Sequence, residues 1–383
     1  MNIVYIRQQS CFSSDSSNGR EWREEIQIKT LANENNVTWV SSDFDHYAKS
    51  KRSQPKLNIR NVEILLLKSF AYKKNISFSR VLSNLLFSIN LGFFLIKNLN
   101  KFDLVICAYP TPESAFTSSL FSKLFSKKCI IDVRDKWPDA FIEKEKSLLA
   151  PIFKIYCDFL NFFIFNFSSS QICMSDSMMN FAERYNKKTK KITVLNNISF
   201  IHNAMNGNKA PSLKLVFYGS INNQFSFDEL VNLSNEAEIK YPNLKIYIIG
   251  DGEMLGEVKN KFKESKNIIF KAKMSFRDLK DFCKDANGYF VFYRNPEVFQ
   301  NHFTNKIIEF CFSGLPVLHN LDQKFSVNGK DISFGYSLNE ISCSAFLKII
   351  NENSHSFPVK DFEIIKEASS IVFFRETIRK LAC

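Results

Sequence analysis

The sequence lacks the cysteine patterns of a disulfide-stapled or zinc-binding protein. Its nine cysteines are scattered over 383 residues, with no Cys-x-x-Cys pair and no cluster of Cys and His. A disulfide framework needs paired cysteines, and a structural zinc site needs closely spaced ligands. These absences argue against both classes and favour a reducing compartment.

We expect neither a secretion signal at the start of this sequence nor a membrane span. Its first seven residues turn polar too early for a signal peptide. The most apolar stretch, residues 148–167, is interrupted by Lys154, Asp158 and Asn161. A spanning helix needs about 20 mostly apolar residues. We therefore expect 148–167 to form a packed or interfacial helix.

Acidic residues are scarce in the first half of the chain. The whole sequence has 51 Lys and Arg against 39 Asp and Glu, a net charge of +12, and residues 1–200 hold 28 against 18, or +10. Within 49–101, 11 basic residues accompany the single acid Glu63. Such a stretch either contacts an anionic surface, of lipid headgroups or nucleic acid, or simply faces solvent. No nucleic-acid recognition module is present, so we expect no nucleic-acid partner.

An apolar stripe lies within the same stretch. Its residues recur at helical spacing, which allows two interpretations. The stripe packs against the core, as such stripes usually do, or it dips into a membrane while the basic residues before it rest on the lipid headgroups. The stripe consists of Leu82, Leu85, Leu86, Ile89, Phe93 and Ile96, and the basic residues are Lys68, Lys73, Lys74 and Arg80.

Strands and helices are predicted to alternate along the whole chain. The length is enough for two domains, and 45% hydrophobic with 23% charged residues is typical of a globular protein. The alternation predicts two parallel α/β layers with right-handed crossovers. We expect a first domain over 1–198, a polar linker over 199–212 and a second domain over 213–363. The expected strands are 3–6, 37–41, 62–67, 104–108, 129–133, 171–174, 192–195, 213–218, 244–249, 268–271 and 286–293.

Residues 305–318 predict a short helix that ends sharply and leads into a buried strand. Thr304 or Asn305 caps its start, because either side chain accepts a bond from free N–H groups. Gly314 suits the left-handed position just past the helix, and Pro316 prevents its continuation.

The first turn of this helix carries the chemistry of a nucleotide site. Lys306 and Glu309 are three residues apart and project from one face. A helix start with a lysine suits a phosphate, and a glutamate one turn deeper accepts hydrogen bonds from two neighbouring hydroxyls, such as those of a ribose. The alternative is an ordinary surface Lys–Glu pair.

Three motifs together resemble glycosyltransferases of family 4. They are Asn305-Lys306-x-x-Glu309 followed by Pro-Val, the run Arg134-Asp135-Lys136-Trp137-Pro138, and Gly250-Asp251-Gly252 after a strand. The second is similar to the Arg-Asp-x-Trp-Pro signature of members that assemble polysaccharides. The resemblance covers nearly the whole chain. It implies the α/β GT-B fold, two Rossmann-like doubly wound domains facing across a cleft, with residues 364–383 packed back on the first domain.

The resemblance also implies which residues bind the two substrates. The family normally places a basic residue soon after the glycine at 219, whereas this chain has none before Lys240. That departure leaves more of the donor's phosphate charge to Lys306 and Arg294. The expected donor-binding residues are Gly19, Gly219, Ser220, Gly250, Asp251, Gly252, Lys271, Arg294, Asn305, Lys306 and Glu309, and the expected acceptor-binding residues are Tyr109, Thr111 and Glu113.

Arg134 and Asp135 are the expected catalytic pair. They follow a predicted buried strand, and loops at the carboxyl ends of parallel strands form the ligand crevice in open α/β sheets. Arg134 would stabilise charge on the leaving phosphate or fix the acceptor, and Asp135 would orient it or accept an acceptor hydroxyl. The alternative is a structural salt bridge that caps the strand.

The implied activity is transfer of a sugar from a nucleotide-diphosphate sugar, a UDP-sugar, with retention of configuration. It needs no metal and no other cofactor. The basic, apolar first domain favours a polyprenyl-linked saccharide as acceptor, as in O-antigen or capsule assembly, and an anionic membrane surface as partner. The protein would then be peripheral on the cytoplasmic face of the membrane. Two rivals remain, a nucleotide-sugar epimerase of the same architecture and a degenerate, membrane-bound partner of another transferase.

Overall fold

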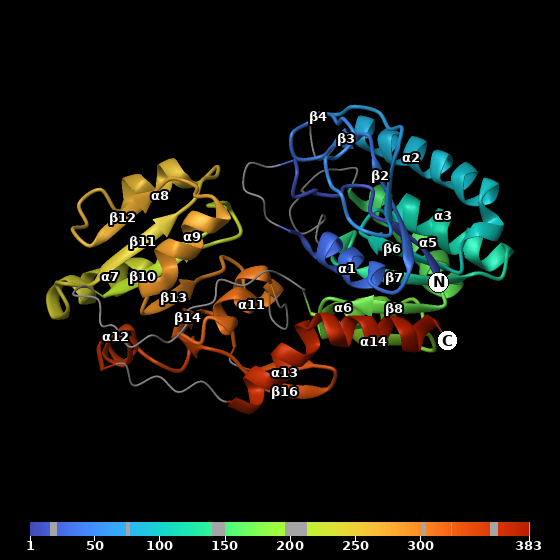
Figure 1. Cartoon of the computed structure of the whole chain (residues 1–383). Helices are drawn as coiled ribbons and strands as arrows, with labels where there is room; N and C mark the ends of the chain where they lie inside the picture. Colours follow the sequence, from blue (N-terminus) through green and yellow to red (C-terminus); the bar gives the residue numbers. More distant parts are fainter. Residues whose placement is uncertain are drawn as a thin grey trace. The chain divides into compact units, whose positions relative to one another are not determined.

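The chain folds into two compact units (Figure 1). The first consists of Met1–Ser16, Glu21–Asn197 and Ala368–Cys383, and the second is mainly Ile198–Glu367. The computed structural model describes residues 1–15, 21–73, 77–139, 150–195, 213–299, 304–322, 324–352 and 359–382. The expected linker 199–212 and Gly19 lie outside these ranges.

The described part of the first domain is built on a seven-stranded parallel sheet. Its strand order is β5-β2-β1-β6-β7-β8-β9. Chain order therefore reverses beside β1, which lies between β2 and β6. The strands are β1 (Asn2–Ile6), β2 (Asn36–Ser42), β5 (Val62–Leu67), β6 (Leu104–Tyr109), β7 (Lys128–Val133), β8 (Ser170–Cys173) and β9 (Lys190–Thr193), with a separate small hairpin of β3 (Phe44–Asp45) and β4 (Ser50–Lys51).

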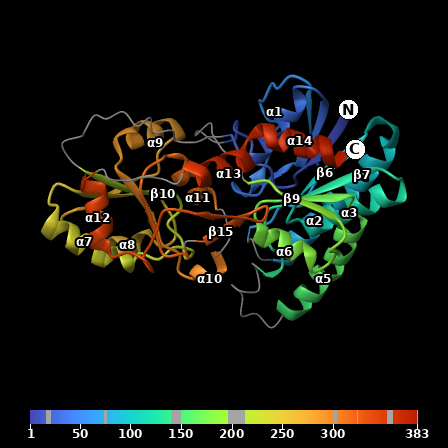
Figure 2. The ribbon, with the colours of Figure 1, turned by 90° about the horizontal axis from the view of Figure 1, so that it is seen from below.

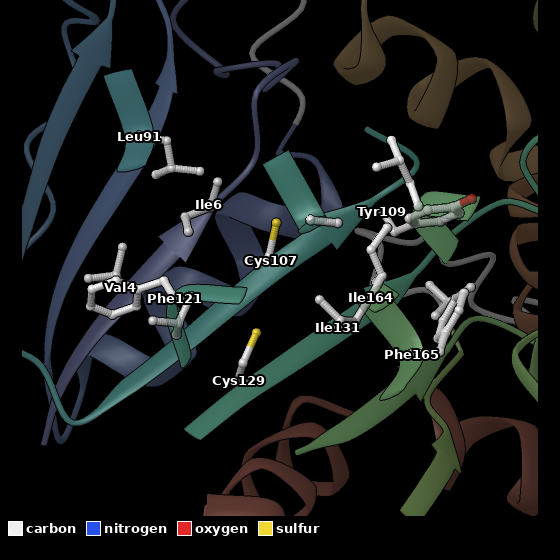
Figure 3. Close-up of a cluster of buried hydrophobic side chains, with 14 of the residues drawn as sticks. Val4, Ile6, Leu91, Cys107, Tyr109, Phe121, Cys129, Ile131, Ile164 and Phe165 are labelled. Atoms are coloured by element: carbon white, nitrogen blue, oxygen red, sulfur yellow. The ribbon is translucent and has the colours of Figure 1, made fainter. Parts of the chain in front are cut away.

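Helices cover both faces of this sheet, so β1 buries side chains on each face. Val4 and Ile6 point into one core, and Ile3 and Tyr5 point into the other. Figure 3 shows the first core, where Val4 and Ile6 gather with residues of β6, β7 and α5. That face carries α2 (Phe78–Lys97), α3 (Pro112–Leu124), α5 (Ala150–Phe167) and α6 (Asp176–Glu183); the other carries α1 (Arg23–Ala32) and α14 (Ile371–Ala382), and η1 (Leu99–Lys101) follows α2.

The apolar stripe of α2 faces outward, so the core-facing interpretation is wrong. The helix buries its other side, which includes Phe87, Leu91 and Leu95. Ile89 is 56% exposed and Phe93 is 69% exposed. Among the described residues, α2 is also the helix that is long and apolar enough to cross a membrane by length and composition alone.

The second domain has a six-stranded parallel sheet in the described residues. Its order is β12-β11-β10-β13-β14-β17. The strand order therefore reverses beside β10: the strands that follow it are added first on one side and then on the other. β10, β13 and β14 are almost wholly buried, as strands covered on both faces are. The strands are β10 (Lys214–Tyr218), β11 (Lys245–Ile249), β12 (Ile268–Lys271), β13 (Gly288–Val291), β14 (Val317–His319) and β17 (Tyr336–Ser337), beside a hairpin of β15 (Lys324–Val327) and β16 (Lys330–Ser333).

From β10 to β14 the helices of the second domain alternate with its strands, as the sequence predicts for crossovers, whereas the β15–β16 hairpin connects β14 to β17. One of them, at 305–312, follows the short helix after β13 and leads directly into β14. The helices are α7 (Glu229–Lys240), α8 (Leu255–Lys261), α9 (Phe276–Phe282), η2 (Cys283–Asp285), α10 (Pro296–Phe299), α11 (Asn305–Phe312), α12 (Cys343–Glu352) and α13 (Val359–Ser369).

The end of the chain returns to the first domain, beside α1 (Figure 2). Phe374, Ile378 and Leu381 of α14 belong to the same core as Trp39 of β2. The amphipathic segment predicted at 364–381 is two helices, because Ser370 interrupts it: its hydroxyl accepts the backbone N–H of Phe373 at 3.0 Å and starts α14.

Candidate functional site

The candidate site lies at the carboxyl end of β10 in the second domain. In open parallel sheets, ligands bind outside the carboxyl ends of the strands, where the strand order reverses. β10 is that point here, since its neighbours β11 and β13 lead to opposite edges of the sheet. The turn after β10 and the first turn of α11 meet at this place.

Local interactions fix where α11 begins and how it lies. Thr304 caps the helix: its hydroxyl oxygen accepts the Ile307 N–H at 3.4 Å and is 2.7 Å from the hydroxyl of Tyr293. Further along the helix, the ring of Phe310 stacks on Tyr289, with 4.6 Å between ring centroids. Gly314 has φ +68°, which is the left-handed stop predicted from the sequence. The helix start is therefore held at a defined place over the sheet.

Lys306 lies directly over the turn that follows β10. A Cβ placed on Gly219 would come within 3.0 Å of the Lys306 ammonium nitrogen and 3.1 Å from its Cε. The same nitrogen is 5.2 Å from the ring centroid of Phe217 and 5.0 Å from that of Phe225. Two aromatic faces and a glycine thus position the cation at the strand end. Ser220, next in the turn, is exposed.

Glu309 lies one turn deeper and is only 3% exposed. The hydroxyl of Tyr218, the last residue of β10, donates a hydrogen bond to its Oε2 at 2.9 Å. Burial and the charge of Glu309 together raise the pKa of Tyr218 well above its ordinary value, so the hydroxyl keeps its proton. Tyr218 therefore orients the carboxylate. Tyr218 was not among the predicted site residues, and its place at the end of a buried strand, just before Gly219, is the only local signal for it.

The turn after β11 packs backbone against backbone with the turn after β10. Gly250 has φ +149°, and a Cβ on it would clash with the carbonyl oxygen of Gly219. Asp251 holds the two turns together, because its backbone oxygen accepts the Ile221 N–H at 2.9 Å and its Oδ1 accepts the Gly252 N–H at 2.8 Å. The Gly-Asp-Gly sequence thus shapes the floor of the site.

The remaining donor-binding predictions are Lys271 and Arg294. Lys271 ends β12, where its carbonyl accepts the Gly250 N–H at 3.1 Å, but its ammonium lies over the ring of Phe282. Arg294 is exposed, and its backbone N–H is bonded to the Gln224 carbonyl at 3.1 Å. The structure therefore brings together Gly219, Ser220, Gly250, Asp251, Gly252, Lys306 and Glu309, with Asn305 at the helix start.

In the first domain, Arg134 forms a salt bridge at the end of its strand, which is the structural alternative that the sequence left open. Its guanidinium donates to Asp132 and Glu24, both at 2.8 Å, and to the hydroxyl of Tyr5 at 2.7 Å. Arg23 completes this network by pairing with Asp132 at 3.1 Å. The Arg134 side chain is 8% exposed. It forms an ion pair at the end of the strand.

The pKa values of the network show how strongly its charges are coupled. Burial by itself would raise the pKa of Asp132, but Arg23 and Arg134 outweigh it and lower that pKa to about 2. Burial also opposes ionisation of Glu24, and again Arg134 reverses the effect and lowers the pKa. Each carboxylate is therefore kept ionised by the cations.

The predicted acceptor residues are buried inside the first domain, which corrects that assignment. Tyr109 belongs to the core of Figure 3, and its hydroxyl is bonded to the Trp137 carbonyl and to Asn161. Thr111 is 1% exposed, and its hydroxyl lies 2.7 Å from that of Ser114. Their side chains serve the packing of the domain, because the residues after β6 turn inward.

Glu113 is also turned inward, at 5% exposure. Its carboxylate accepts hydrogen bonds from Asn84 and Tyr156, each at 3.2 Å. Burial raises the pKa of Glu113 above its ordinary value. Asp135 is nearer the surface and accepts the backbone N–H of Lys136 at 2.8 Å, which shapes the loop after β7.

Asp43-Phe44-Asp45 is an Asp-x-Asp triplet, a pattern that holds metal ions in some transferases. Its carboxylates serve their own loop: Asp43 accepts the backbone N–H of Ser69 at 2.8 Å, and Asp45 pairs with Arg52 at 3.1 Å. Within the ranges that the structure describes, no three His, Cys, Asp or Glu side chains are grouped to hold a metal ion.

Comparison with known proteins adds the fold. No protein-family model matches the sequence, and no curated protein matches it either. Among solved structures, Anabaena HepE bound to UDP-glucose has a TM-score of 0.60 and 12% identity, covering 99% of this chain and 98% of that one. Sucrose-phosphate synthase from Thermosynechococcus elongatus has a TM-score of 0.61 and 12% identity, covering 100% and 96%.

A third similar structure is the lipopolysaccharide outer core galactosyltransferase WaaB in its apo form. Its TM-score is 0.58 at 13% identity, covering 98% of each chain. The chain has the GT-B fold. At such identities the likeness shows the fold alone, so function must be argued from the site.

Proposed function

We propose that this protein is a glycosyltransferase that takes a sugar from a nucleotide-diphosphate donor, a UDP-sugar. The observation that carries the proposal is the pairing of Lys306 with the Gly219 turn and of Glu309 with Tyr218. A cation and a carboxylate are thereby held one helical turn apart at the strand end where this type of sheet binds nucleotides. Similar structures, such as that of HepE in complex with UDP-glucose, support the donor class.

The phosphates of the donor would lie over the Gly219 turn. The start of α11 offers backbone N–H groups with a partial positive charge, and Lys306 adds a full one. The missing basic residue after Gly219 leaves these two as the main source of positive charge, without a metal. As the bond to the sugar breaks, the same groups would stabilise the leaving diphosphate, which is an electrostatic form of catalysis. Retention of configuration is part of the proposal and rests on the family resemblance.

The ribose would lie against Glu309. The carboxylate accepts one bond from Tyr218, and each carboxylate oxygen has two acceptor sites, so two adjacent hydroxyls fit it. A buried carboxylate that is oriented before the ligand arrives loses little entropy on binding. This accounts for a tyrosine at the last position of β10.

We propose a polyprenyl-linked saccharide as acceptor, because the first domain carries an apolar outer surface. The outward residues of α2 and α5 form this surface, and α3 packs between the two helices. Lys97, Lys101 and Lys123 are exposed at one end of the layer, where they suit anionic headgroups. The surface consists of Phe78, Leu82, Leu85, Ile89, Phe93 and Ile96 of α2 with Ile152, Ile155, Phe159 and Phe162 of α5.

Such a surface fits a protein that lies on the membrane. Monomeric soluble proteins rarely expose a large continuous apolar patch without a partner for it. Because α2 buries its other side in the first domain, the helix would rest in the interface instead of spanning it. We therefore propose a peripheral location on the cytoplasmic face and a role in O-antigen, capsule or related polysaccharide assembly.

The test is transfer of labelled sugar from UDP-sugars to polyprenyl-linked acceptors, read by mass spectrometry of lipid-linked oligosaccharides with and without the protein. Glu309→Ala removes a charge-assisted hydrogen bond worth about 1.5–3 kcal/mol, so donor binding should weaken by about tenfold or more. Glu257→Ala, on α8, is the matched control. A folded Glu309→Ala protein with wild-type turnover would remove the basis of the proposal.

A degenerate, non-catalytic partner of another transferase is the second candidate. It is favoured by the absence of a basic residue between Gly219 and Lys240. Calorimetry with UDP and UDP-sugars separates the two, because a scaffold has no need to bind donor. Tight UDP binding that depends on Glu309 excludes it.

A further inference from the structure

A second group of charged side chains lies at the corresponding place in the first domain. β1 is the strand beside which the order of that sheet reverses, and Arg7 follows it directly. The Nε and Nη1 atoms of Arg7 are buried and have no hydrogen-bond partner among the residues that the structure describes. Buried donors almost always find a partner, and each one left alone lowers stability. The burial of these two nitrogen atoms is therefore not explained by the packing of the domain.

The end of β1 lies against the first turns of α2, because Gln8, next to Arg7, donates from its Nε2 to the Oδ1 of Asn84 at 2.9 Å. Arg80 precedes Asn84 by one turn, and two further groups, His46 and Lys49, contact Tyr72. His46, after β3, has its Nδ1 atom 2.6 Å from the hydroxyl of Tyr72, and the ammonium of Lys49 is 5.0 Å from the Tyr72 ring centroid. Burial, followed by the charges of Arg80, Lys49 and Arg7, lowers the pKa of His46 to about 3. The local potential is therefore strongly positive, and the imidazole is neutral at physiological pH.

The carboxylates nearest this group are engaged elsewhere. Asp45 pairs with Arg52 and accepts backbone N–H groups of the β3–β4 turn. Glu24 is bound by Arg134 and is also stabilised in its charged form by Arg7, and Glu113 is bound by Asn84 and Tyr156 and is also affected by the charge of Arg80. An added anion would thus meet a positive field whose nearby acids already have other partners.

We propose that Arg7 and Arg80, with His46 and Lys49, bind a phosphate group of the lipid-linked acceptor. This rests on the proposed function and names the part of the acceptor that the first domain holds. Guanidinium groups bind phosphate oxygens in pairs with fixed geometry. Two of the four groups are arginines, and one of them has buried N–H groups that lack a partner.

The position of Arg80 indicates a lipid phosphate over a free one. Arg80 lies in the first turn of α2, between Phe78, which is 76% exposed, and Leu82, which is 39% exposed. The outward apolar stripe of α2 begins beside it. A phosphate bound at Arg80 would therefore place an attached polyprenyl chain along α2. The charged phosphate would contact the arginine, and the apolar chain would contact the outward apolar stripe.

The test uses farnesyl diphosphate as a soluble probe, with binding measured by calorimetry. Arg7→Gln and Arg80→Gln should each weaken binding by at least tenfold, while Arg60→Gln, the loss of an exposed arginine in the same domain, should leave it unchanged. Arg7→Gln should not lower the melting temperature, since the two buried atoms have no partner to lose. A structural role for Arg7 predicts the opposite melting result.

Further variants distinguish this site from its alternatives. Glu309→Ala should retain farnesyl diphosphate binding and lose UDP binding. If only Glu309→Ala weakens the probe, the diphosphate lies in the second domain and the inference is overturned. It is also overturned if the wild-type protein does not bind the probe, or if phosphatidylglycerol vesicles displace it. Binding that depends on Arg7 and Arg80 without any UDP binding would support the phosphate site while the proposed transferase fails.

Discussion

Replacing Gly219 by alanine tests the donor site most directly, because the structure specifies what the new methyl group meets. The Cβ would come within 3.0 Å of the Lys306 ammonium and 3.1 Å from its Cε. Lys306 has a flexible side chain, so it would turn away while the backbone stays in place. The variant therefore removes the cation from the turn without removing the lysine from the protein.

Two separate costs are expected. Losing the ion-assisted contact to a donor phosphate costs about 1.5–3 kcal/mol of binding free energy, which corresponds to about 10-fold to 150-fold in UDP affinity. Gly219 also has φ +129°, where a residue with a Cβ is strained, and the strain costs roughly 1–3 kcal/mol of folding stability. Calorimetry with UDP measures the first cost, and urea unfolding measures the second.

Matched variants separate the two effects. Gly314→Ala introduces strain at φ +68° with no atom within 4 Å of the new methyl group, so it should lower stability and keep UDP affinity. Lys306→Ala should match the loss of affinity of Gly219→Ala, and the double variant should be no worse than either, because both remove one interaction. Wild-type UDP affinity in Gly219→Ala, or additive losses in the double variant, would refute the reasoning.

Three further predictions concern the first domain. Arg134→Ala leaves buried carboxylates without their cation, so it should lower the free energy of unfolding by about 3–5 kcal/mol in urea titrations, whereas Arg184→Ala, at a half-exposed ion pair, should change it by less than about 1 kcal/mol; equal effects would contradict the buried network. The pKa of Asp132 is lowered to about 2 in the folded state, so its contribution to the free energy of unfolding is present above its ordinary pKa near 4 and is lost as pH falls from 4 to 2. A free energy of unfolding that does not change over this pH range in the wild-type protein would contradict the lowered pKa. Phe93→Ser and Phe159→Ser should each reduce co-sedimentation with anionic vesicles and leave the melting temperature unchanged, since both side chains are more than half exposed; lowered melting temperatures would instead indicate that they are packed.

Local signals in the sequence were enough to predict many of the elements. β5 and β12 have the predicted limits, because a run of apolar residues between polar neighbours marks each strand even though neither is fully buried. The end of α11 is also as predicted, since Gly314 and Pro316 act within a few residues of themselves. The partners of charged side chains were not predictable in this way. Arg134 pairs with Glu24, which is 110 positions away in the sequence, and no pattern near either residue indicates the pair.

The direction of an apolar stripe was equally beyond the sequence. On α2, the inward face carries Ser83, Asn84 and Ser88 among its apolar residues, while the outward face is almost wholly apolar. Periodicity locates a stripe but does not state whether protein or another medium covers it. Likewise, Tyr218 became part of the site only when the structure placed it beside a residue 91 positions away.

The packing of α14 has a consequence for the order in which the chain acquires structure during synthesis. Domains generally fold as units as they leave the ribosome, the N-terminal one first. Here, one core of the first domain includes Phe374, Ile378 and Leu381, so it stays unfinished until those residues emerge. The second domain, whose sheet ends at Ser337, has its strands available earlier. The first of the two domains in the sequence would then be the last to complete its core, and the apolar side chains that α14 covers would stay exposed until that helix emerges.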